Sequence, residues 1–193
     1  MDILYALTAD RFTHGLAQHN VCSDWILWAL GQIHPAFLVV RSEAAMVARG
    51  HSLFCSQSSF VLMSMAAEAG IRARHVGLYG HVVMEAFYDG GWHLYDPDYE
   101  VVVRDEAGQV IGVQDLLARR DLLAEAYLGP KSAVIPALLS TQDNTFMSYP
   151  GGAWFVWKDQ VLYLLERVTR WLKYLLPVVM AGIAIRLMKR KRR

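Results

Sequence analysis

The chain contains only two cysteines, Cys22 and Cys55, among its 193 residues. They do not form a Cys-x-x-Cys pair, and the seven histidines include no His-x-x-x-His pair, so common zinc-ligand spacings are absent. We therefore expect no bound metal, and without a glycine-rich phosphate loop we also expect no nucleotide or other cofactor. A metal site would have to be assembled by the fold from isolated histidines, which include His51, His75, His81 and His93.

A strong charge imbalance is also lacking, because 19 lysines and arginines face 18 acidic residues, for a formal net charge of +1. Basic residues do not alternate with aromatic residues through the body of the chain, so we expect no nucleic-acid binding. Residues 1–20 lack the basic region and long apolar core of a secretion signal. We expect the main domain to lie in the cytoplasm, a reducing compartment that keeps cysteine thiols free.

The charge-free apolar run at residues 174–185 is shorter than the roughly 20 residues that a membrane-spanning helix needs. It reaches a spanning length only if Lys173 and Arg186 extend their charged ends to the lipid headgroups. An apolar stripe at helical spacing precedes the run, and the basic residues 189–193 follow it. We predict that residues 154–193 form a long amphipathic-to-apolar helix that associates with a membrane surface. The alternative is a helix that docks onto another protein subunit, with the basic residues 189–193 solvated.

Cys55 stands at the start of a predicted helix. Residues 56–69 are rich in alanine, methionine and leucine and contain neither proline nor glycine, and Gly70 is placed to cap the C-terminus. A cysteine at a helix N-terminus lies beside unpaired backbone N–H groups and the positive end of the helix dipole, which favour a thiolate. This position suits a nucleophile. A small apolar residue buried beneath the helix is the alternative interpretation.

Three strands are predicted after Gly70, at residues 71–79, 81–88 and 92–95. Asp89 and Gly90 lie between the last two, and Asp-Gly is a strong signal for a tight hairpin turn.

The expected register of this hairpin brings a histidine close to a carboxylate. With a two-residue turn Tyr88 pairs with Gly91, and counting outward along the ladder places Val83 opposite Asp96. His81 lies two residues before Val83, so it shares a face with Asp96 as its diagonal neighbour. A thiol, an imidazole and a carboxylate are the parts of an activated cysteine nucleophile. We therefore predict that Cys55, His81 and Asp96 act together.

Several segments in this order resemble the core of the transglutaminase-like cysteine enzyme superfamily, which includes transglutaminases, cysteine peptidases, peptide N-glycanases and bacterial amidases. The resemblance implies a papain-like core in which Cys55 is the nucleophile, His81 the general base and acid, and Asp96 the group that orients His81. It further implies a peptide or protein amide substrate. The segments that carry the resemblance are Gly50, Cys55 and residues 69–76, 81–85 and 91–97.

Several alternatives within this interpretation stay open. The thioester intermediate could be resolved by water, as in a peptidase or amidase, or by an amine, as in a transglutaminase. The Cys55 N–H is a natural oxyanion donor, and the resemblance suggests Trp25 or Trp28 as a second, although both also fit core positions. Residues 51–54 separate Gly50 from Cys55, whereas the family has these closer, so a noncatalytic binding or scaffold module is the alternative function.

The predicted fold class is α+β, with N-terminal helices, a helix bearing Cys55 on an antiparallel sheet, and a long C-terminal helix. Glu85 shares a strand face with His81, and we expect it to be solvated. The expected divisions are a transglutaminase-like domain at residues 1–128, a connection at 129–153 and the C-terminal helix at 154–193. Further expected elements are helices within residues 1–49 with 25–30 buried, a helix at 42–48, a hairpin over 100–113 and a helix at 114–128.

Overall fold

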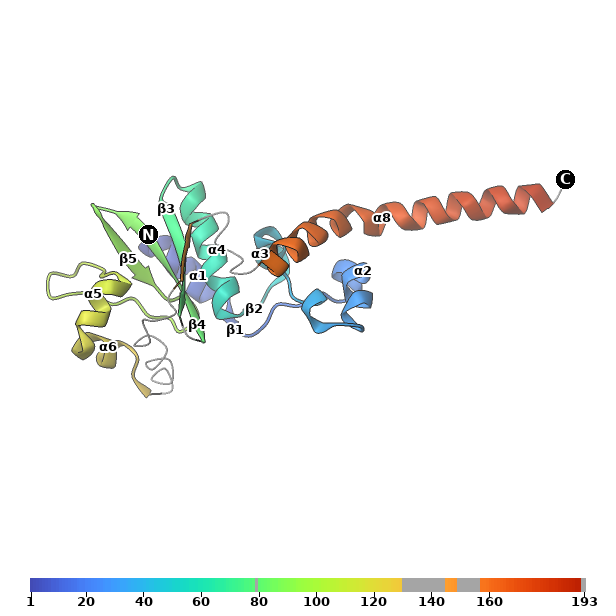
Figure 1. The fold of residues 1–193 in the computed structure, drawn as a ribbon. Coiled ribbons are helices and arrows are strands. Elements are labelled where there is room, and N and C mark those ends of the chain that lie inside the picture. The colour runs from blue at the N-terminus through green and yellow to red at the C-terminus, as the bar shows by residue number, and fades with distance from the viewer. Residues whose placement is uncertain (79, 130–144, 149–156, 192–193) are drawn as a thin grey trace. The chain divides into compact units, whose positions relative to one another are not determined.

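The structure, a computed structural model, describes residues 1–78, 80–129, 145–148 and 157–191. It is a mixed α+β protein with two compact units (Figure 1). Unit 1 comprises Met1–Ala17 and Glu43–Trp157, and unit 2 comprises Gln18–Ser42 and Lys158–Arg193. The expected sequence divisions differ from these units, because residues 18–42 group with the C-terminal helix rather than with the strands.

Helix α4 (Cys55–Glu68) begins and ends as its sequence predicts. At its start the Gln57 side chain accepts a hydrogen bond from the Phe54 N–H at 3.1 Å. At its end Gly70 adopts a φ of 76°, and its N–H and that of Ile71 donate to the carbonyls of Ala67 and Ala66. This is a Schellman cap, which requires a left-handed residue and therefore favours glycine. The predicted role of Gly70 is confirmed.

A four-stranded antiparallel sheet forms the centre of unit 1, in the order β5-β4-β3-β6. Asp89 and Gly90 both have positive φ, as a two-residue type I′ turn requires, and Tyr88 pairs with Gly91. The predicted hairpin register is confirmed. The connection expected at residues 129–153 includes a strand, β6, and most of the rest of it lies outside the described residues. The strands are β3 (Arg72–Leu78), β4 (His81–Tyr88), β5 (Gly91–Tyr95) and β6 (Thr145–Ser148).

The two faces of the sheet are covered by different parts of unit 1 (Figure 1). Helix α4 packs on one face, and α1 (Asp2–Arg11) packs against α4. On the other face a buried cluster joins the strands to the following loop and to helices α5 (Val113–Ala118) and α6 (Arg120–Ala126). The cluster consists of Val76, Leu78, Val83, Leu94, Val101, Val103, Val113, Leu116, Leu123 and Tyr127.

Residues 100–128 depart in detail from the predicted hairpin and helix. The hairpin is reduced to isolated bridges, of Asp96 with Val101 and of Arg104 with Val110. The helix is interrupted at Arg119, whose φ of −111° and ψ of 71° are not helical. Two short helices result, and both can then turn their apolar residues toward the sheet.

Two short elements lead into α4. Strand β1 (Thr13–His14) pairs in parallel with β2 (Ser52–Leu53), which ends two residues before Cys55. Helix α3 (Glu43–Arg49) precedes β2 and packs against α4, close to the predicted bounds of 42–48. The N-terminal segment is therefore attached to the chain directly ahead of Cys55.

Unit 2 combines α2 (Val21–Gly31) and the 3-10 helix η1 (Pro35–Phe37) with most of the long helix α8 (Trp157–Lys191). Leu27 is buried, but Trp25 and Trp28 are 39% and 40% exposed. The expectation that residues 25–30 are buried throughout is therefore wrong. Only one side of α2 contributes residues to the unit's interior, which leaves the other apolar side chains partly uncovered.

Buried polar contacts hold α8 to the other segment of unit 2. Glu166 accepts hydrogen bonds from the Arg41 and Ser42 N–H groups at 2.7 and 3.1 Å, and Thr169 donates to Asp24 at 2.8 Å. The Lys173 ammonium, expected to extend toward lipid headgroups, is buried and donates to the Ser23 carbonyl. The part of α8 that packs within unit 2 thus ends near Lys173.

Beyond Lys173 the side chains of α8 are mainly exposed and apolar. By length and composition the helix could cross a membrane, with a mean hydropathy of 1.5 over its most apolar window. Only 6% of that window is buried, whereas the core helix of a soluble protein would be largely buried. The exposed apolar residues here are Tyr174, Leu175, Val178, Val179, Met180, Ile183, Ile185, Leu187 and Met188.

Candidate active site

The β4–β5 hairpin brings His81 and Asp96 into direct contact. His81 is the first residue of β4, and Asp96 follows the last residue of β5. His81 Nε2 donates to Asp96 Oδ2 at 2.8 Å, and the two residues are 4% and 0% exposed. This contact follows from the two-residue turn, because a third turn residue would have moved the histidine to another register.

Asp96 is held by two further hydrogen bonds, which the sequence does not indicate. The Tyr127 hydroxyl donates to Asp96 Oδ2 at 2.9 Å, and the Tyr99 N–H donates to Oδ1 at 3.1 Å. Burial and the negative charge of Asp96 raise the pKa of Tyr127 well above its ordinary value, so the hydroxyl remains a donor. A buried carboxylate with these donors has a fixed orientation, and it fixes the His81 ring in turn.

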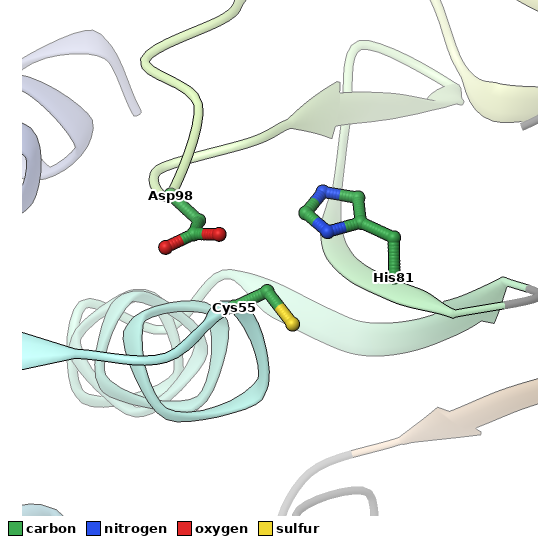
Figure 2. Close-up of side chains that lie close together, drawn as sticks. All are labelled: Cys55, His81 and Asp98. Carbon is green, nitrogen blue, oxygen red and sulfur yellow. The ribbon is translucent and has the colours of Figure 1, made fainter. Parts of the chain in front are cut away.

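Cys55 lies beside His81 (Figure 2). It is the first residue of α4 and is 7% exposed. The sulfur of Cys55, a ring nitrogen of His81 and a carboxylate oxygen of Asp98 all lie within 4.8 Å of one another. Because Asp96 engages Nε2 of His81, Nδ1 is the nitrogen left for the sulfur. The three residues predicted from the sequence are therefore neighbours in space.

The surroundings of His81 favour its protonated form. Burial disfavours the imidazolium, but the hydrogen bonds to Asp96 and Cys55, together with their charges, outweigh it and raise the pKa of His81 to about 10. An unperturbed histidine has a pKa of about 6.5. The protonated form of His81 is therefore favoured at neutral pH.

Titration of the His81 ring by NMR is expected to show a midpoint near pH 10, because the partners that raise its pKa favour the charged ring. The ring is protonated below this pH and loses its proton as the pH rises through it. Cys55→Ser should lower the midpoint, since Cys55 supplies part of the shift, and the His81→Gln spectrum assigns the signal. A midpoint near 6.5 would contradict the site's electrostatics.

Asp98 and His14 extend the site, and sequence patterns did not identify either. Asp98 Oδ1 lies 2.8 Å from His14 Nδ1, and the two side chains are 2% and 59% exposed. Burial raises the pKa of Asp98, although the hydrogen bond to His14 acts in the opposite direction. The β1–β2 pairing brings His14 close to Cys55, and no local pattern predicts a contact across 84 residues. The only available signal for Asp98 is that it follows Asp96 by two positions.

Gln57 fixes the start of α4 against the N-terminal segment. Its Oε1 accepts hydrogen bonds from the N–H groups of Ala17 and Phe54 at 3.0 and 3.1 Å, and its Nε2 donates to the Ala17 carbonyl at 3.2 Å. A glutamine at the third position of a helix is a known capping residue, which is the signal that could have identified it. The helix turn that carries Cys55 is thereby held in place.

The expectation that Glu85 is solvated is wrong, because Glu85 is 1% exposed. It forms an ion pair with Arg74 at 2.6 Å and accepts a hydrogen bond from the Val113 N–H, at the start of α5, at 2.8 Å. A carboxylate at a helix N-terminus satisfies an unpaired N–H and complements the helix dipole. Glu85 thus attaches α5 to the sheet.

The remaining predicted residues lie elsewhere. Trp25 and Trp28 belong to unit 2, so their suggested role as oxyanion donors stays a prediction, and the Trp25 indole N–H donates to the Lys173 carbonyl at 3.1 Å. Cys22 and Cys55 are both free, so no disulfide between them occupies the thiol. Comparison of the chain with protein-family models, curated proteins and solved structures found no match.

Proposed function

We propose that this protein is a cysteine acyltransferase or amidohydrolase that acts on a peptide or protein through Cys55, His81 and Asp96. The observation that carries the proposal is a buried His81 bonded to Asp96 at 2.8 Å and adjacent to the Cys55 sulfur. A nucleophile, a base within reach of it and a group that orients the base are the requirements for covalent acyl chemistry. The helix-start cysteine and sheet-borne histidine and aspartate also support a papain-like or transglutaminase-like core.

The proposed reaction begins from the thiolate of Cys55 and the imidazolium of His81. The thiolate attacks the amide carbonyl, and His81 gives its proton to the leaving amine, which leaves an acyl group on the sulfur as a thioester. Neutral His81 then takes a proton from water or an incoming amine, which attacks the thioester. The products are the acid or a new amide, and the thiolate–imidazolium pair is regenerated.

The start of α4 supplies an oxyanion donor in this scheme. The first backbone N–H groups of a helix have no partner within the helix, and that of Cys55 lies at the first helical position. Removing one such donor commonly costs about 10²–10³-fold in rate. Trp25 and Trp28 remain the candidates for a second donor that the family resemblance suggests.

A noncatalytic peptide-binding or scaffold module is the competing proposal. It would be favoured if His81 faced away from Cys55 or if the thiol were remote from any base. Instead, the two reactive groups lie within 4.8 Å of each other, and Asp96 holds the histidine. This arrangement favours the catalytic proposal.

Alkylation of the two cysteines in one chain tests the reactivity of the site. Near pH 7 we expect iodoacetamide to modify Cys55 about tenfold or more faster than Cys22. The proposed reaction holds Cys55 as a thiolate, whereas an ordinary thiol is only a few per cent ionised at this pH. Exposure alone predicts the reverse order, since Cys22 is exposed and Cys55 buried. Peptide mass spectrometry measures both rates, and His81→Ala should remove the difference. Slower modification of Cys55 than of Cys22 would count against the proposal.

We further propose that the C-terminal part of α8 attaches the protein to a membrane, with unit 1 in the cytoplasm. The support is the exposed apolar surface beyond Lys173, which is followed by the basic residues 189–193. Basic residues flank both ends of the apolar run, and the positive-inside rule favours the cytoplasm for each. A helix lying in the membrane interface satisfies both ends. Peptide or protein substrates near the membrane, or other subunits of a membrane complex, would then be its partners.

Truncation of residues 176–193 is expected to move the protein from the membrane fraction to the soluble fraction. The truncated chain keeps the α8 residues that pack within unit 2, the last of which is Lys173. A matched variant, Val179→Asp with Ile183→Asp, keeps the chain length and should also be released, because charges within an apolar membrane-bound segment are costly. Sedimentation of cell fractions measures the outcome. An unchanged membrane fraction for both variants would exclude this segment as the anchor.

A further inference from the structure

Three kinds of zinc ligand converge at one place in unit 1. Figure 2 shows Cys55, His81 and Asp98 approaching from the start of α4, the start of β4 and the turn after β5. One ligand atom from each residue lies within 4.8 Å of the other two. Zinc bonds of about 2.0–2.3 Å at tetrahedral angles require ligand atoms about 3.3–3.8 Å apart. Side-chain rotations that move the atoms by about 1 Å would close this group around an ion.

The hydrogen bonds around the group match those that orient zinc ligands. A zinc-bound histidine nearly always donates its other ring N–H to a carboxylate or carbonyl, and His81 already does so to Asp96 at 2.8 Å. Ligating carboxylates are also hydrogen-bonded, and Asp98 contacts His14 at 2.8 Å. Both side chains therefore have an outer partner that leaves another ligand atom available.

We propose that Cys55, His81 and Asp98 bind a zinc ion, and that bound zinc blocks the thiol. The ion would take the sulfur lone pair needed for attack and the Nδ1 position needed for proton transfer, and the displaced protons would pass to solvent. Three protein ligands leave a fourth position for water. The blocking effect rests on the proposed function, whereas the binding of zinc does not.

The group lies just beneath the surface, as reversible binding requires. Asp98 and Cys55 are largely covered, but His14, which contacts Asp98, has a side chain that is 59% exposed. No spacing motif predicts the site because its ligands come from separate elements. The order and spacing of Cys55, His81 and Asp98 along the chain match no zinc-binding sequence motif.

Isothermal titration calorimetry tests the binding: zinc is titrated into the metal-free full-length protein in detergent near pH 8. We expect one zinc per chain, with the affinity of Asp98→Asn at least tenfold lower and that of His14→Ala lowered by about 10–100-fold through loss of an outer partner. Cys22→Ser and His51→Ala serve as matched controls and should bind as the wild type does. Absence of saturable binding, or equal affinity in Asp98→Asn and wild type, would overturn the proposal.

A second readout separates this inference from the proposed function. Zinc should slow the alkylation of Cys55 but not that of Cys22 in the same chain, and a chelator should restore the rate. Acylation of Cys55 by a peptide ester in the presence of chelator tests the enzyme proposal alone. Zinc binding without acylation would support the metal site and reject the enzyme, whereas acylation without zinc binding would reject the metal site alone.

Discussion

Replacing Cys55 with alanine is expected to lower the rate of acyl transfer by roughly 10⁴–10⁶-fold, as loss of the nucleophile does in hydrolases that act through a covalent intermediate. Without the sulfur no thioester forms, and His81 alone offers only general acid–base assistance. The rate would be measured on a panel of peptide esters and amides, by release of the leaving group and by transfer to an added amine. The same panel separates hydrolysis from transamidation.

Cys22→Ala is the matched control for this prediction. It removes the only other thiol, which is exposed and belongs to unit 2, and should leave the rate unchanged. Circular dichroism would establish that both variants are folded. If Cys55→Ala kept the activity of the wild type, Cys55 would not be the nucleophile and the site would need another role.

Asp96→Asn is expected to lower the rate by about 10⁴-fold, which is the effect of the same change in a serine protease triad. The carboxylate accepts hydrogen bonds from His81, Tyr127 and the Tyr99 N–H. A neutral amide no longer favours the His81 cation, so the pKa of His81 should fall toward its ordinary value. The acyl-transfer rate and the NMR titration of His81 should therefore change together.

Tyr127→Phe distinguishes the charge of Asp96 from the hydrogen bond that orients it. It removes one hydrogen bond to Asp96 but keeps the carboxylate and nearly all of the buried ring, at a cost of about 1.5–3 kcal/mol in stability. We expect a rate loss of about tenfold at most, with His81 still protonated at neutral pH. If Tyr127→Phe were as damaging as Asp96→Asn, the orientation of Asp96 by this hydrogen bond, rather than its charge alone, would determine the rate.

The parts of the site that could be predicted from sequence depend on local rules. Helix α4 contains no proline or glycine and ends at Gly70, so both its existence and its C-terminus follow from backbone preferences. The Asp89-Gly90 turn fixes the strand register, and this register places His81 beside Asp96. Two of the three predicted residues were thus positioned by a single turn.

The parts that could not be predicted depend on tertiary contacts. His14 reaches Asp98 across 84 positions, and Tyr127 reaches Asp96 because the break at Arg119 sets the direction of α6. Glu85 has the strand position of a solvated residue, but the start of α5 covers it. Periodicity identifies the face that a residue occupies, whereas these contacts depend on which distant segment covers that face.

The most direct test of the central claim is capture of the acyl group on Cys55. The full-length protein would be mixed with a peptide ester in the presence of chelator, quenched in acid and mapped by peptide mass spectrometry. We predict a hydroxylamine-sensitive acyl adduct on Cys55 that is absent from Cys55→Ala and accumulates more slowly in Asp96→Asn. The absence of an adduct on Cys55, or an equal adduct on Cys22, would contradict the proposed function.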